Sequence, residues 1–221
     1  MKPVKHYKHF IFDFDGVISD SYELAVEKFN EIRNELFQQL PKVETKNDMA
    51  IVYAGSLKTC LNKWIGQEGT KIFFNHHSKR MQEVSEAIQP FRGVVQILNS
   101  LGEKKVSIVT SSYSEAVINI LSKDISFNEN MIYKIAGREL HQTKTEKIIN
   151  TLTELGLTKE DAVYVGDLES DILYCRDVPI DIISVGYGYH PSEYLQNFKP
   201  TYFVDSLNEL GNLLNQMNPS N

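Results

Sequence analysis

The chain has 221 residues, a formal net charge of −6 and 24% charged residues. This length allows one large domain, or one domain with a smaller insert. The acidic balance argues against a broad nucleic-acid-binding surface. The sequence contains no run of about 18 apolar residues, so we expect no membrane span. Cys60 and Cys175 stand far apart and outside any metal-binding pattern, so we expect buried thiols and a reducing, cytoplasmic compartment.

A first strand is predicted at residues 9–12, where the mostly apolar "HFIF" runs directly into Asp13, Phe14 and Asp15. Successive side chains alternate between the two faces of an extended chain, so Asp13 and Asp15 point the same way. Two carboxylates this close repel each other, and their ionised forms are costly in a dry environment. The pair therefore indicates a functional site.

Residues 20–90 predict a helical insert after this strand. The first helix has one apolar face, made by Ala25, Phe29, Ile32 and Leu36. A second helix is indicated by the apolar residues Leu57, Leu61, Trp64 and Ile65. Gly55 and Gly66 predict breaks between helices.

Five more short apolar runs follow the insert, and each predicts a strand, at residues 105–109, 131–136, 162–166, 181–186 and 201–204. Helical patterns lie between them at residues 112–121 and 143–156, and Thr143 with Glu146 begins the second as a capping box. This alternation predicts an α/β fold with a doubly wound, Rossmann-like parallel sheet. Its core comprises residues 1–19 and 91–221, with the insert at 20–90.

Acidic side chains follow two of the predicted strands. Asp13 and Asp15 end the first, and Asp167 and Asp171 follow the strand at residues 162–166. Ligands bind beyond the carboxyl ends of the strands in an open parallel sheet. If these strands are neighbours, the carboxylates form a site of oxygen ligands, and this donor set favours Mg²⁺.

A buried pair of carboxylates can also divide the chemistry of a hydrolysis. A carboxylate can act as a nucleophile and form an acyl phosphate, and we assign this role to Asp13. The second can protonate the leaving oxygen and later accept a proton from water, and we assign this role to Asp15. Gly16 permits a tight turn, or a close approach of the backbone, directly after the pair.

A phosphoryl group needs hydrogen-bond donors and positive charge around its oxygens. Thr110 can donate its hydroxyl, and the backbone N–H groups around Ser111 and Ser112 are expected to open a helix and favour an anion. Lys144 lies in the first turn of a helix, where a cation is unfavourable for the helix dipole. This local conflict indicates that Lys144 is placed for a ligand or a carboxylate.

Four ordered motifs resemble those of the haloacid dehalogenase superfamily, namely "DFDGVISDS", "IVTSS", the lysine of "QTKTEKI" and "VYVGDLESD". The match spans about residues 8 to 205 and is most similar to the phosphoglycolate-phosphatase-like branch, in which a helical cap follows the first motif. The resemblance implies that Asp13 is the nucleophile and Asp15 the general acid and base. It also implies that Thr110 and Lys144 bind phosphate.

The resemblance further implies that Mg²⁺ is held by Asp13, Asp167 and the main-chain carbonyl of Asp15, with Asp171 in support. Lys144 is followed by Thr145, where many relatives carry proline, so Lys147 is the alternative lysine. The implied substrate is a small phosphorylated metabolite. We expect a monomer or a homodimer that binds neither nucleic acid nor membranes.

The leading hypothesis is therefore a Mg²⁺-dependent phosphatase. A sugar-phosphate mutase would use the same Asp13 chemistry with a different acceptor. A phosphonate hydrolase would need a Schiff-base lysine from the cap, for which Lys58 and Lys63 are the candidates. A non-catalytic relative that only binds a ligand or a partner is the remaining alternative, although it would be expected to lack Asp13 or Asp15.

Overall fold

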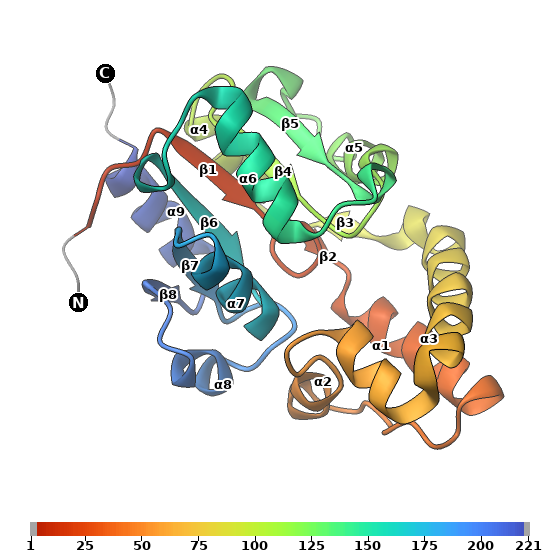
Figure 1. Ribbon diagram of the computed structural model, residues 1–221. Helices are drawn as coiled ribbons and strands as arrows, with labels where there is room; N and C mark the ends of the chain where they lie inside the picture. The colour runs from red at the N-terminus through yellow and green to blue at the C-terminus, as the bar shows by residue number, and fades with distance from the viewer. Residues whose placement is uncertain (1–3, 219–221) are drawn as a thin grey trace.

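The computed structural model describes residues 4–218, and the six strands of its main sheet are all parallel (Figure 1). The strand order is β5-β4-β1-β6-β7-β8. The bounds of the strands are β1 His9–Phe12, β4 Val106–Val109, β5 Ile132–Ala136, β6 Ala162–Gly166, β7 Asp181–Val185 and β8 Tyr202–Val204. β1 therefore lies in the middle of the sheet, between β4 and β6, and the strand order changes direction there.

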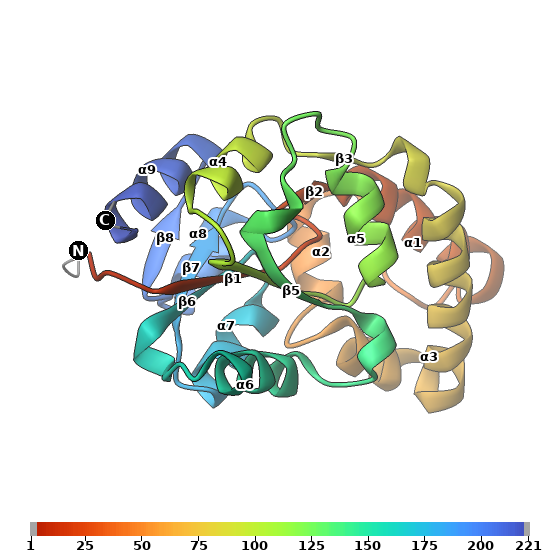
Figure 2. The same ribbon diagram turned by 90° about the horizontal axis from the view of Figure 1, so that it is seen from above.

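Helices cover both faces of this sheet, as expected for a doubly wound fold (Figure 2). One face packs against α4 (Val94–Ser100), α5 (Ser114–Leu121) and α9 (Leu207–Met217). The other packs against α6 (Lys144–Leu155), α7 (Glu169–Asp177) and α8 (Ser192–Asn197). β1 serves both cores, because Phe10 and Phe12 point to the first face and Ile11 points to the second.

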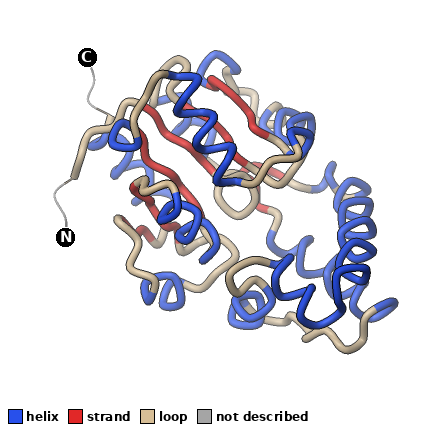
Figure 3. Tube along the Cα trace, in the orientation of Figure 1, coloured by secondary structure: helices blue, strands red, loops and turns tan. Residues whose placement is uncertain are grey.

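The helical insert forms a separate layer at one end of the molecule (Figures 1 and 3). It contains α1 (Tyr22–Leu36), α2 (Lys46–Val52) and α3 (Leu57–Glu83). Two short antiparallel strands, β2 (Ser19–Asp20) and β3 (Gln89–Pro90), connect it to the main sheet. Tyr189 comes from a loop of the sheet domain and packs in the core of the insert, which joins the two parts. We call residues 20–90 the cap.

Short 3₁₀ turns complete the chain at Ser85–Ala87, Glu129–Met131, Arg138–Leu140 and Lys159–Asp161. No helix within residues 4–218 is both long and apolar enough to cross a membrane. Cys60 and Cys175 are buried free thiols, as predicted.

The predicted fold class is confirmed, and the six predicted strands exist with bounds that differ by at most a residue. Gly66 breaks the helical backbone within α3, as predicted, with φ of 71°. Leu36 does not belong to the buried face of α1, because it is the last residue of the helix and is 44% exposed. The helix predicted from residue 112 begins at Ser114 instead, because Tyr113 is extended and serves as its N-cap residue.

Candidate active site

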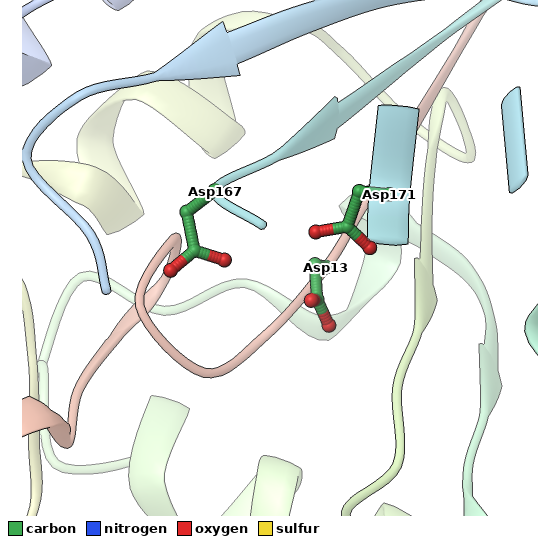
Figure 4. A group of neighbouring side chains, drawn as sticks. All are labelled: Asp13, Asp167 and Asp171. Carbon is green, nitrogen blue, oxygen red and sulfur yellow. The ribbon is translucent and has the colours of Figure 1, made fainter. Parts of the chain in front are cut away.

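Three aspartates from two neighbouring strand ends meet at one edge of the sheet (Figure 4). Asp13 follows β1 directly, Asp167 follows β6, and Asp171 lies in the first turn of α7. Each offers one carboxylate oxygen, and these three oxygens lie within 4.8 Å of one another. All three side chains are buried. The parallel pairing of β1 with β6 brings them together, because both strands end at the same edge.

Asp13 is held by a lysine and by its own backbone turn. Its Oδ2 accepts a hydrogen bond from Lys144 Nζ at 2.5 Å, and its Oδ1 accepts one from the backbone N–H of Phe14 at 2.7 Å. Burial raises the pKa of Asp13 to about 7; Lys144 opposes this rise and Asp171 adds to it. Lys144 also donates to Asp171 Oδ1 at 2.9 Å, so one ammonium group serves two carboxylates.

Asp167 is fixed by close backbone packing. Its Oδ2 accepts a hydrogen bond from the backbone N–H of Tyr189 at 2.7 Å. A Cβ on Gly16 would lie 2.1 Å from this Oδ2, and a Cβ on Gly188 would lie 2.4 Å from it, so both positions need glycine. Burial raises the pKa of Asp167 well above its ordinary value, and Asp13 and Asp171 raise it further.

Asp171 has both a structural and an electrostatic role. Its Oδ2 accepts a hydrogen bond from the backbone N–H of Leu168 and so caps the start of α7. Its Oδ1 accepts from Lys144 and from the hydroxyl of Tyr164, at 3.3 Å. Tyr164 is fully buried on β6, and sequence analysis did not identify it as a site residue. Tyr164 stands within an apolar run that predicts a strand, and no polar neighbour marks it as a site residue.

Asp15 lies outside the group of three aspartates and is held by hydroxyl groups. Ser21 Oγ donates to Asp15 Oδ1 at 2.8 Å, and Ser112 Oγ donates to Asp15 Oδ2 at 2.7 Å. Asp13 and Asp15 therefore have different surroundings although they are two residues apart. One is buried with a cation, and the other is half-buried among neutral donors.

The loop after β4 brings the predicted phosphate-binding residues to the same edge. Thr110 is fully buried, and its Oγ1 accepts a hydrogen bond from the backbone N–H of Ser112 at 3.0 Å. Ser111 is exposed, and neither it nor Ser112 opens a helix as predicted, because α5 begins two residues later. Lys147, the alternative to Lys144, donates to the carbonyl of Thr110 at 2.7 Å, so its ammonium group supports the loop.

The donor set fits a small divalent cation. Three carboxylates and one ammonium group leave a net formal charge of −2 when all are ionised. Asp167 Oδ1 is buried and has no hydrogen-bond partner among residues 4–218, so it is available as a ligand. Oxygen ligands of this kind are those that hard cations prefer.

Residues 10–185 match the family model described as haloacid dehalogenase-like hydrolase. The chain belongs to this family of hydrolases. It is similar to pyrophosphatase PpaX of Halalkalibacterium halodurans, with 22% identity over 204 residues that cover 90% of this chain and 93% of that one. The family predicted from the four motifs is confirmed.

Solved structures share the fold. A predicted phosphatase from Clostridium acetobutylicum superimposes with a TM-score of 0.74 and 21% identity, covering 96% of this chain and 100% of the other. A predicted phosphoglycolate phosphatase from Haemophilus somnus gives a TM-score of 0.71 and 18% identity, covering 92% and 96%. At these identities the likeness establishes the α/β core with its helical cap.

The cap of this hydrolase contributes side chains that sequence analysis did not identify. Lys46, the first residue of α2, donates from Nζ to the carbonyl of Tyr187 at 3.0 Å and lies 5.5 Å from the centre of the Tyr22 ring. Burial lowers the pKa of Lys46, and Asp167 opposes this. Tyr53 follows α2, and its ring contacts those of Tyr189 and His190 edge-on. The cap is therefore closed over the aspartates.

Proposed function

We propose that the protein is a Mg²⁺-dependent phosphatase that hydrolyses a small phosphorylated metabolite through a phosphorylated Asp13. The observation that carries this proposal is the different surroundings of two carboxylates. Asp13 lies among Asp167, Asp171 and Lys144, whereas Asp15 lies among hydroxyl groups at the cap side. Such a division suits a nucleophile beside an acid and base.

In the first step, a carboxylate oxygen of Asp13 attacks phosphorus and the bond to the leaving oxygen breaks. Asp15 gives its proton to that oxygen, so the leaving group departs as an alcohol or an acid. The Thr110 hydroxyl and the Lys144 ammonium group stabilise the negative charge on the phosphoryl oxygens. Asp13, Asp167 and Asp171 would hold or support Mg²⁺, which when bound offsets the charge of the carboxylates and of the phosphoryl group.

In the second step, water attacks phosphorus, Asp15 takes a proton from it, and the bond to Asp13 breaks. Inorganic phosphate leaves, and both aspartates return to their first states. The closed cap excludes bulk water, which protects the acyl phosphate from uncontrolled hydrolysis. The names of the similar proteins, a pyrophosphatase and a phosphoglycolate phosphatase, support a small phosphorylated substrate.

The test is a phosphate-release screen over small phosphorylated metabolites, run with Mg²⁺ and with a chelator. We expect release that depends on Mg²⁺ and disappears in Asp13→Asn. Asp177→Asn, an exposed change on α7, is the matched control and should keep full activity. Phosphate release by Asp13→Asn above a few per cent would remove Asp13 as nucleophile, and an isomerised sugar phosphate in place of free phosphate would indicate a mutase.

A further inference from the structure

Three polar side chains, from the cap and from the end of β5, lie on segments that are linked to Asp15 through its hydrogen-bond partners Ser21 and Ser112, and each keeps polar atoms without a hydrogen bond in the described part of the chain. They are Tyr53 after α2, His77 in α3 and Arg138 in the 3₁₀ turn after β5. The mechanism proposed above uses none of them. Because Asp15 is the proposed proton donor to the leaving group, side chains that are linked to Asp15 through its hydrogen-bond partners are candidates to bind that group.

Arg138 is tied to the site through its backbone and to the cap through its side chain. Its N–H donates to the carbonyl of Ser112 at 2.8 Å, and Ser112 in turn holds Asp15. Its guanidinium group donates through Nη1 to Ser78 Oγ of α3 and lies 5.7 Å from the centre of the Tyr113 ring. The turn after β5 approaches α3 (Figure 2).

The guanidinium group of Arg138 has no anionic partner within residues 4–218. It has no carboxylate within salt-bridge distance, and Ser78 is its one hydrogen-bond partner in the described part of the chain. A half-buried arginine with free donors is suited to bind a carboxylate or a phosphate, because its planar fork matches both.

His77 precedes Ser78, the residue of α3 that accepts the hydrogen bond from Arg138. Its ring stacks on Phe73 at 5.8 Å, and its nitrogens form no hydrogen bond within residues 4–218. Burial lowers the pKa of His77 to about 4; Asp15 opposes this and Arg138 adds to it. The ring is therefore neutral near pH 7 and offers one donor and one acceptor.

Tyr53 is linked to Asp15 by a second route. The centre of its ring lies 6.1 Å from that of Tyr189, whose hydroxyl lies 2.9 Å from the Ser21 Oγ that donates to Asp15. Burial raises the pKa of the Tyr53 hydroxyl, and the charges of Asp15 and Asp167 raise it further, so the phenol is neutral near pH 7. The hydroxyl forms no hydrogen bond with any residue from 4 to 218. It is thus a neutral donor that is available to a ligand.

We propose that Arg138, His77 and Tyr53 form a leaving-group subsite that binds a second anionic group of the substrate. The arginine supplies the charge, and the two neutral side chains supply hydrogen bonds. The preferred substrates are then small phosphoesters or phosphoanhydrides whose leaving group carries a carboxylate or another phosphate. This inference rests on the proposed function for the position of the leaving group at Asp15.

Binding of three phosphonates tests the subsite without turnover. Methylenediphosphonate carries a second phosphonate, phosphonoacetate carries a carboxylate, and methylphosphonate carries neither. Calorimetry with saturating Mg²⁺ should show that the unchanged protein binds at least one of the first two about ten- to a hundred-fold more tightly than methylphosphonate, as expected for a hydrogen-bonded ion pair. The tighter of the two identifies the anion.

Arg138→Ala should reduce this preference to about threefold or less while methylphosphonate binding is kept, which also shows that the variant is folded. Arg138→Lys should keep part of the preference. Ser78→Ala removes the contact with the cap but not the charge, so it should keep the full preference. Equal binding of all three ligands by the unchanged protein, or an equal loss for all three in Arg138→Ala, would overturn the subsite.

The binding result is separable from the phosphatase proposal. A strong preference for the doubly anionic ligands, with no phosphate released from any metabolite, would leave the subsite in place and remove the phosphatase function. Phosphate release with Mg²⁺, but without this preference, would remove the subsite and leave the phosphatase function.

Discussion

Replacing Lys144 with methionine should strongly destabilise the protein when no divalent cation is present. The lysine side chain is 10% exposed, and it pairs with Asp13 and Asp171, whose side chains are 6% and 0% exposed. Methionine keeps most of the apolar stem but removes the ammonium group, which leaves buried carboxylates without a cation. Breaking a buried ion pair in this way costs about 3–5 kcal/mol. The relief of an unfavourable cation at the start of α6 returns only a few tenths of a kcal/mol.

Urea unfolding at pH 8 in a chelator measures this loss. The matched control is Lys134→Met, because the Lys134–Glu154 pair has side chains that are 25% and 47% exposed and should contribute less than about 1 kcal/mol. Saturating Mg²⁺ should recover part of the stability of Lys144→Met, since a bound cation supplies the missing positive charge. A loss below about 1 kcal/mol in the chelator would contradict the view that Lys144 neutralises this site.

Three further predictions concern the cation, the cap and acid stability. Asp167→Ala should raise the Mg²⁺ concentration for half-maximal activity at least about tenfold, whereas Asp177→Ala should leave it unchanged. The same half-maximal Mg²⁺ concentration for Asp167→Ala and the unchanged protein would place the cation elsewhere. Lys46→Met loses the hydrogen bond to the Tyr187 carbonyl and should lower kcat/KM about tenfold with little change in unfolding free energy, whereas the exposed Lys42→Met should do neither. Burial lowers the pKa of His9 to about 4, so its stabilising contribution is complete above the unfolded-state pKa of about 6.5 and is lost as the pH falls. His9→Gln should therefore lose about 2 kcal/mol less unfolding free energy than the unchanged protein between pH 7 and pH 5. Equal losses for the two proteins, measured by urea unfolding, would refute the lowered pKa of His9.

The sequence predicts the sheet well because each strand is covered on both faces. Such strands must be apolar throughout, so runs like residues 162–166 stand out, and polar residues directly after them mark the functional edge. Asp13, Thr110 and Asp167 could be found for this reason. The order of the strands could not be read from these runs, because any neighbour would satisfy their apolar faces equally well.

The short helices and the cap contacts were harder to predict. Residues 94–100 and 192–197 form helices of only two turns or less, too short for a clear periodic pattern. Tyr53, His77 and Arg138 come from three separate elements, and nothing local in any of them conflicts with an ordinary surface or core position. Their links to the hydrogen-bond partners of Asp15 form only when the cap packs against the sheet domain, which is a property of the folded molecule.

Lys46 is different, because a local signal for it was present. "TKND" at residues 45–48 and "TKTE" at residues 143–146 both form capping boxes with a lysine as the first helical residue. A cation is unfavourable at that position in both helices. The conflict led to Lys144, whose ammonium group lies against Asp13 and Asp171. The same reasoning applied to Lys46 would have led to the loop that positions Asp167, because Lys46 donates to Tyr187 and the neighbouring Tyr189 N–H holds the Asp167 carboxylate. A repeated violation of the same helix rule therefore identifies one lysine on each side of the closed active site.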